Sequence, residues 1–240
     1  MSRLAVIGGN SILGTDLGTD GTPTEVVVEG AAEPVTLLDC GGFVLFQRHG
    51  ASVYRAAPAL DHRAHLRALQ LASVDRILGL ASVGSLVPER LPVGAALAPD
   101  DFIALHLGVS FSTGAGAAQV PGFDPQWRAA VLDAWPHDLL ALHDGGVYWQ
   151  VIGPRFETPA EVRLIANYAD VVGMTIASEA ILARELDIPY AAVCMVDNLA
   201  NGLAPRPLTI AEFEAGKRAN QAVLLRALAA VLPVLSEPSP

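Results

Sequence analysis

The 240-residue sequence predicts a single α/β domain with a mixed, largely parallel central β-sheet flanked by helices. Short apolar runs alternate with segments of helical spacing over most of the chain, which is typical of this class. The run Tyr190–Val196 is apolar throughout between Pro189 and Asp197, as expected for a strand covered on both faces of a parallel sheet. We expect one domain over residues 1–232 and a loose tail over 233–240.

The first third of the sequence predicts strands and one helix. Leu4–Ile7 is an apolar strand that leads into a glycine turn. Thr24–Glu29 and Val35–Cys40 favour an antiparallel hairpin, which would add antiparallel pairing to the sheet. Gly42–Gln47 is a further apolar strand, and Leu60–Ala72 has apolar residues at helical spacing.

The middle of the sequence is rich in glycine, alanine and proline and carries weaker signals. Arg76–Ala81 and Phe102–His106 favour strands, and a long loop is expected over Ser110–Gly122. Asp124–Ala134 favours a helix, because an aspartate in the N-cap position precedes a proline in the first helical position.

A second helix start follows the apolar strand Val147–Ile152 and a Gly-Pro turn. Thr158 and Glu161 have the spacing of a capping box, and Pro159 occupies the first helical position. The remaining C-terminal elements are a strand at Asp170–Gly173 and helices at Thr158–Ala169, Ile176–Leu186 and Ile210–Leu232.

The composition limits the possible partners. Lys and Arg number 15 and Asp and Glu 25, so the net charge of −10 argues against nucleic acid and anionic membranes. No apolar run reaches the length of a membrane span, and the sequence opening lacks a basic signal-peptide front, so we expect a cytoplasmic protein. Cys40 and Cys194 lie in apolar runs and are expected to be reduced core thiols. We expect no metal.

Polar and aromatic residues follow six predicted strands. They are Asn10/Ser11, Arg48/His49, Ser82/Ser85, Phe156/Glu157, Met174/Thr175 and Asp197/Asn198. Each pair has an ordinary structural explanation, such as a turn, or an N-cap in the case of Thr175. Parallel strands would bring all six pairs to one edge of the sheet. Together they offer an anion site and a platform for a planar heterocycle, which indicates a ligand with phosphate, sugar and base.

Four motifs resemble the trimeric purine nucleoside phosphorylase family, which includes methylthioadenosine and methylthioinosine phosphorylases. They are GPRFETPAEVR (Gly153–Arg163), RHG (Arg48–Gly50), VGSL (Val83–Leu86) and the stretch Gly173–Asn198. The resemblance implies phosphorolysis of a purine nucleoside to the free base and a pentose 1-phosphate. It further implies inorganic phosphate as co-substrate, no cofactor, and a homotrimer.

The resemblance also implies roles for residues of this sequence. Phosphate would be bound by Asn10, Ser11, Arg48, His49, Ser82 and Thr175, ribose by Met174 and Tyr148, and the base by Phe156, Glu157, Asn198, Val83 and Gly84. Asn198, Glu157 and His49 would be the catalytic residues. The histidine that faces a 5′-hydroxyl in the family is replaced near Thr209, so Leu208 and Ile210 would form an apolar pocket for the 5′-substituent.

The pair Glu157 and Asn198 favours a 6-oxopurine. An asparagine amide can donate to a carbonyl at position six and accept from a protonated ring nitrogen, whereas an aspartate suits an amino group. Four alternatives remain open: a methylthioadenosine phosphorylase, a nucleosidase that uses water, an inert nucleoside-binding paralogue, and a dinucleotide enzyme. The last is disfavoured because Gly8, Gly9 and Gly14 do not form GxGxxG.

Overall fold

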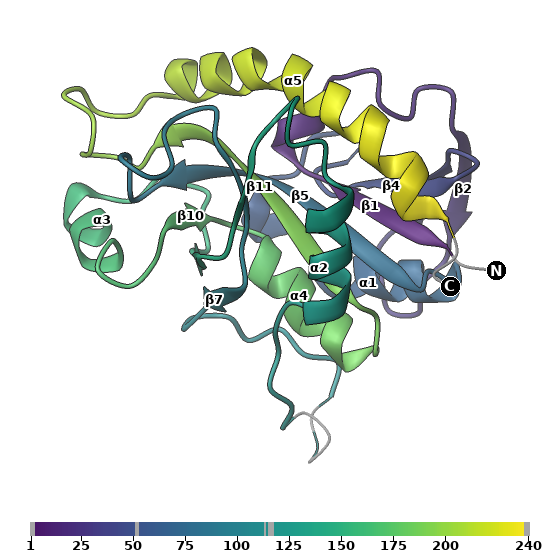
Figure 1. Ribbon diagram of the computed structural model, residues 1–240. Helices are drawn as coiled ribbons and strands as arrows, with labels where there is room; N and C mark the ends of the chain where they lie inside the picture. The colour runs from purple at the N-terminus through teal and green to yellow at the C-terminus, as the bar shows by residue number, and fades with distance from the viewer. Residues whose placement is uncertain (1–2, 51–52, 113, 115–117, 238–240) are drawn as a thin grey trace.

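The computed structural model describes residues 3–50, 53–112, 114 and 118–237. Its described strands are β1 Leu4–Gly8, β2 Thr22–Val26, β3 Val35–Asp39, β4 Phe43–Gln47, β5 Arg76–Ser85, β6 Ala96–Ala98, β7 Asp101–Ile103, β8 Leu142–Asp144, β9 Val147–Gln150, β10 Val171–Gly173 and β11 Tyr190–Leu199. Its α-helices are α1 His62–Leu71, α2 Pro125–Ala134, α3 Pro159–Ile165, α4 Ile176–Glu185 and α5 Ile210–Ser236. The predicted α/β class is confirmed (Figure 1).

The sheet is parallel at its centre and antiparallel at one junction that matters for the site. Strand β1 lies parallel to β4 and β5, and β11 lies parallel to β5. Strand β10 runs antiparallel to β5, pairing Val172 with Gly84, and parallel to β9. Strand β10 pairs with the last two residues of β5, Gly84 and Ser85, and because of this reversal the chain leaves β10 in the direction of the start of β5.

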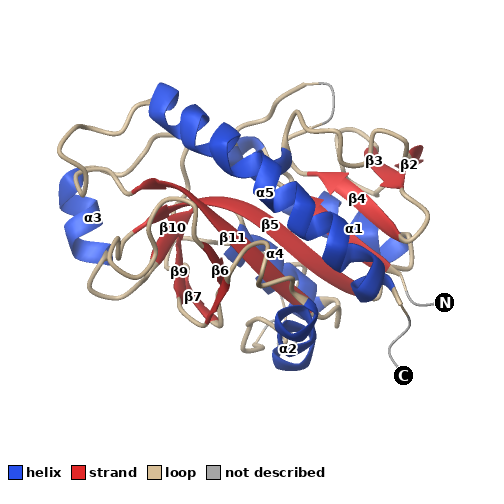
Figure 2. Cartoon of the chain, turned by 45° about the horizontal axis from the view of Figure 1, so that its top comes forward, coloured by secondary structure: helices blue, strands red, loops and turns tan. Residues whose placement is uncertain are grey.

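Helices cover both faces of the sheet (Figures 1 and 2). Side chains alternate between the faces of a strand, and β1 shows the consequence. Ala5 and Ile7 belong to a core with α1 and α4, whereas Leu4 and Val6 belong to a core with α2 and α5. A third, smaller core joins α3 to the ends of β5 and β10.

Helix α5 has 27 residues and is, in the part of the chain that the structure describes, the one helix long and apolar enough to cross a membrane. Its buried side chains, among them Leu224, Leu228 and Val231, pack on the sheet as part of the second core. Gly216 brings the helix very close to β11, since a Cβ at this position would lie 1.8 Å from the carbonyl oxygen of Asp197.

Several element boundaries differ from the sequence predictions. The expectation of a loose tail from residue 233 is wrong for residues 233–236, where α5 continues through Pro233 and buries Leu235; residues 238–240 lie outside the described part. Strands β6 and β8 were missed, because three-residue strands carry too few residues for a pattern. Strand β7 ends at Ile103, three residues before the predicted end.

Candidate active site

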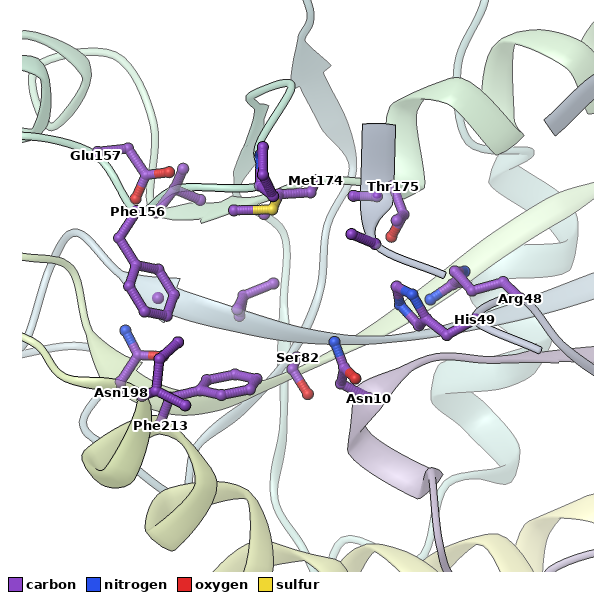
Figure 3. A pocket seen from close by; sticks show the side chains of 18 of the residues that line it. Asn10, Arg48, His49, Ser82, Phe156, Glu157, Met174, Thr175, Asn198 and Phe213 are labelled. Atoms are coloured by element: carbon purple, nitrogen blue, oxygen red, sulfur yellow. The ribbon is translucent and has the colours of Figure 1, made fainter. Parts of the chain in front are cut away.

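A cavity of about 160 Å³ opens where β1, β4, β5, β10 and β11 come together. Twelve residues predicted for the site line it: Asn10, Arg48, His49, Ser82, Val83, Gly84, Phe156, Glu157, Met174, Thr175, Asn198 and Ile210. Figure 3 shows that the labelled side chains divide into two ends, with Met174 between them. One end carries aromatic rings, a carboxylate and an amide, and the other carries small polar groups, a histidine and an arginine.

The sheet topology explains the convergence of these residues. Asn10 follows β1, and Arg48 and His49 follow the adjacent strand β4. Ser82 lies inside β5, which lengthens past the predicted end to Ser85. Asn198 lies inside β11, at an irregularity in the pairing between β11 and β5. Strand ends therefore supply only part of the cavity.

Arg48 is held by the protein on most sides. Its Nε and Nη2 donate to the two carboxylate oxygens of Glu179 at 2.6 and 2.9 Å, and Nη1 donates to the Leu80 carbonyl at 2.7 Å. Tyr190 donates a further hydrogen bond to the same carboxylate at 2.6 Å. A Cβ on Gly9 would lie 2.3 Å from Nη1, so this glycine makes room for the guanidinium. The charge of Arg48 is therefore balanced by Glu179 before any ligand binds.

His49 is neutral at physiological pH. Burial and the nearby charge of Arg48 lower the pKa of its imidazole to about 4. Its Nδ1 lies 2.8 Å from the Arg55 carbonyl oxygen, which can only accept, so Nδ1 carries the proton. The other ring nitrogen, Nε2, is therefore a hydrogen-bond acceptor. The ring stacks on Tyr54, with 5.2 Å between ring centroids.

Thr175 occupies the N-cap position of α4, as predicted, but its side chain makes no capping hydrogen bond. Figure 3 shows its hydroxyl pointing toward His49. The amide nitrogens of Thr175 and Ile176 donate instead to the Tyr148 hydroxyl, at 3.1 and 3.4 Å. Tyr148 is fully buried and lies outside the cavity lining, so the structure does not support its predicted contact with ribose.

The other end of the cavity is aromatic and carries one buried acid. The rings of Phe156 and Phe213 pack at a centroid distance of 6.0 Å, tilted by 58°. Asn198 donates one amide hydrogen to the Leu199 carbonyl at 2.9 Å, which leaves its oxygen and second hydrogen for a ligand. Glu157 is 7% exposed, and burial raises the pKa of its carboxyl.

Helix α3 begins as predicted, directly after Glu157. Thr158 accepts from the Glu161 amide at 3.2 Å, and Glu161 accepts from the Thr158 amide at 2.7 Å, which completes the capping box. Arg155, which had no role assigned by sequence, donates to both oxygens of Glu161 at 2.7 Å. That hydrogen bonding lowers the pKa of the Glu161 carboxyl to about 2.

Two further predicted site residues lie outside the cavity, and seven of the described residues that line it were not predicted, among them the aromatic residues Tyr54 and Phe213. Ser11 is buried behind Asn10, and its hydroxyl has no hydrogen-bond partner. Leu208 lines a neighbouring pocket under residues 197–202. Phe213 has the helical spacing of a core residue, and Tyr54 carries no signal beyond its position in the loop after His49.

Comparisons with known proteins agree with this geometry. The model of the phosphorylase superfamily matches residues 3–233. A probable 6-oxopurine nucleoside phosphorylase of Archaeoglobus fulgidus is 34% identical over 213 residues, covering 88% of this chain and 87% of that protein. The S-methyl-5′-thioadenosine phosphorylase of Mycobacterium tuberculosis is 34% identical over 209 residues, covering 84% of this chain and 77% of that protein.

A solved structure shares the fold at lower identity. The methylthioadenosine phosphorylase of Schistosoma mansoni in complex with adenine superposes with a TM-score of 0.86, covering 100% of this chain and 93% of that chain. The sequences are 19% identical, so this likeness concerns the fold alone.

Proposed function

Because the chain belongs to the phosphorylase superfamily, we propose that it catalyses phosphorolysis of a 6-oxopurine nucleoside to the free base and a pentose 1-phosphate. The observation that carries this function is the two-ended cavity, with Glu157 and Asn198 at one end and Thr175 and His49 at the other. A nucleoside bound between them has its glycosidic bond near Met174. The 6-oxopurine phosphorylase names of several relatives support the choice of base.

The phosphate end works through hydrogen bonds more than through net charge. Glu179 balances the charge of Arg48, so the neutral groups of Thr175, Asn10 and Ser82 supply much of the binding. The neutral His49 ring accepts through Nε2, and this suits a phosphate oxygen that carries a proton. The site thus holds phosphate near the anomeric carbon of the nucleoside.

The base end stabilises the leaving purine. Glu157, as a carboxylate, accepts from the N1–H of a 6-oxopurine, while Phe156 packs on the ring face. During reaction a phosphate oxygen forms a bond to C1′ as the C1′–N9 bond breaks, and the bonding electrons pass to the purine. In this proposal the Asn198 amide stabilises that developing negative charge by donating a hydrogen bond to the purine, and its oxygen accepts from the ring nitrogen once that nitrogen is protonated.

The 5′ end of the sugar would meet an apolar surface. Ile210 and Phe213, one turn apart on α5, both line the cavity. Neither can hydrogen-bond a 5′-hydroxyl, whereas both can pack on an alkylthio group. These two side chains favour 5′-methylthioinosine over inosine, by roughly tenfold in kcat/KM for an apolar substituent of this size.

One panel of reactions tests the function. Inosine, guanosine, methylthioinosine and methylthioadenosine are incubated with and without phosphate, and the free base is measured by chromatography. We expect phosphate-dependent release of hypoxanthine, fastest from methylthioinosine. Base release at the same rate with and without phosphate would identify a nucleosidase. Release of base from methylthioadenosine alone would overturn the assignment of a 6-oxopurine. Binding of a nucleoside without turnover would identify an inert paralogue.

The assembly and location follow the family resemblance. The chain acts as a homotrimer in the cytoplasm, with a purine nucleoside and phosphate as its partners and without an organic cofactor. Light scattering on the purified protein tests the assembly, with an expected mass of three times the 25.0 kDa of one chain.

A further inference from the structure

Three helices of the described chain have threonine in the N-cap position, and in one of them the threonine hydroxyl does not cap the helix. In α3 the Thr158 hydroxyl accepts from the Glu161 amide at 3.2 Å, and in α5 the Thr209 hydroxyl accepts from the Glu212 amide at 3.2 Å. These are the usual capping bonds to the third helical residue. The Thr175 hydroxyl at the start of α4 makes no such bond.

Gln150, the last residue of β9, makes that bond in place of Thr175. Its Oε1 accepts from the amide of Ser178, the third residue of α4, at 3.1 Å. Its Nε2 donates to the Ser178 hydroxyl at 2.7 Å, which fixes the orientation of the side-chain amide. Gln150 is 3% exposed, lies outside the cavity lining, and has no part in the proposed reaction.

Tyr148 completes the cap from two residues earlier on the same strand. Side chains two apart on a strand point to the same face, so both reach the start of α4. The Tyr148 hydroxyl accepts from the amides of Thr175 and Ile176. Gly173 leaves room for this, since a Cβ there would lie 2.4 Å from the Tyr148 oxygen.

From this geometry we infer that Gln150 is a positioning residue, which caps α4 in place of Thr175 and so frees the Thr175 hydroxyl to donate to bound phosphate. The inference rests on the proposed phosphate-dependent function. Without Gln150 the Ser178 amide would be buried without this partner, and an N-cap hydroxyl such as that of Thr175 is the usual acceptor for the amide of the third helical residue. The Thr175 hydroxyl cannot point toward the Ser178 amide and into the cavity at the same time. If it capped α4, it would therefore be lost to bound phosphate.

The test compares three variants of the full-length protein by KM for phosphate and KM for nucleoside. Gln150→Met keeps the side-chain volume but removes the cap, and Thr175→Val removes the hydroxyl but keeps its shape. We expect each to raise KM for phosphate roughly tenfold, the value of one hydrogen bond to a charged group, with KM for nucleoside nearly unchanged. The double variant should match Thr175→Val alone, because both changes remove the same interaction.

A matched control separates positioning from general loss of a helix cap. Asp124 caps α2 by accepting from the Trp127 amide at 2.7 Å and lies away from the cavity. Asp124→Ala should lower stability and leave KM for phosphate as in the wild type. Additive effects in the double variant, or an equal rise in KM for phosphate in Asp124→Ala, would overturn the inference.

A crystal structure of Gln150→Met judges the inference even if the wild type proves independent of phosphate, a result that would remove the proposed function. We expect the Thr175 Oγ1 to move to hydrogen-bonding distance of the Ser178 amide. A hydroxyl that still points into the cavity would overturn the inference, whatever the reaction.

Discussion

Helices α3 and α4 begin beside the same cavity with the same residue type, and their threonines do opposite things. Thr158 uses its hydroxyl to cap α3 and takes no part in lining the cavity. Thr175 lines the cavity, and the side chain of Gln150 on strand β9 caps α4 in its place. An N-cap threonine is therefore available for a ligand only where a neighbouring element satisfies the helix amides.

The carboxylates at the start of α3 show a parallel contrast. Glu161 faces solvent and is held by Arg155 and the Thr158 amide, which lower the pKa of its carboxyl to about 2. Glu157 is buried at the cavity, and burial raises the pKa of its carboxyl. Four residues apart, one carboxylate stabilises the helix and the other is available to bind a base.

The largest effect is expected from removing the charge of the buried carboxylate. Glu157→Gln should lower kcat/KM about 100-fold, since a hydrogen bond to a charged group is lost at a desolvated site. Glu161→Gln keeps a capping acceptor and should change kcat/KM by less than about threefold. Steady-state rates with the preferred nucleoside measure both. Equal losses in the two variants would remove the distinction between the carboxylates.

The same contrast predicts the pH dependence. The base end needs Glu157 ionised, and the pKa of this carboxyl is raised, so activity is present at neutral pH and lost as pH falls through the raised value. Below that pKa, kcat/KM should fall about tenfold per pH unit. A pH–rate profile should show this acid limb in the wild type and in Glu161→Gln but not in Glu157→Gln. A limb that persists in Glu157→Gln would assign it to another group.

The smallest effects distinguish the two threonines. Thr175→Val should raise KM for phosphate roughly tenfold with little change in the free energy of unfolding, because its hydroxyl makes no capping bond. Thr158→Val should lower the free energy of unfolding by about 1 kcal/mol and leave KM for phosphate unchanged. Urea unfolding and phosphate titrations measure the two quantities. Matching behaviour in both assays would mean that the two helix starts are equivalent.

Much of this molecule follows from local sequence patterns. The capping box at Thr158, the buried strand at Tyr190–Val196 and the α/β class are confirmed, because each rests on short-range chemistry or on periodicity. Most residues predicted for the site also line the cavity, but the convergence of strand ends explains only some of them. Convergence of parallel strand ends does not account for Ser82 and Asn198, which lie inside their strands.

The misplaced residues share one physical cause. Tyr148 precedes the motif that suggested a ligand, and only the pairing of β9 with β10 shows that its hydroxyl is directed at a helix start. Phe213 has the spacing of a core residue, and only its ring contact with the distant Phe156 shows that it faces the cavity. A local sequence pattern shows on which face of a helix or strand a side chain lies. The groups that this face meets come from distant parts of the chain, and the local pattern does not show them.

Gly216 has a bearing on attempts to change substrate range. The helix carrying Phe213 and the strand carrying Asn198 meet there backbone to backbone, so their separation is set where no side chain intervenes. A methyl group at this position would push α5 outward, and Phe213, one turn away, would move with it. The width of the base-binding end of the cavity therefore depends on Gly216, which does not line the cavity. Mutant libraries that vary only the lining residues would not change this width.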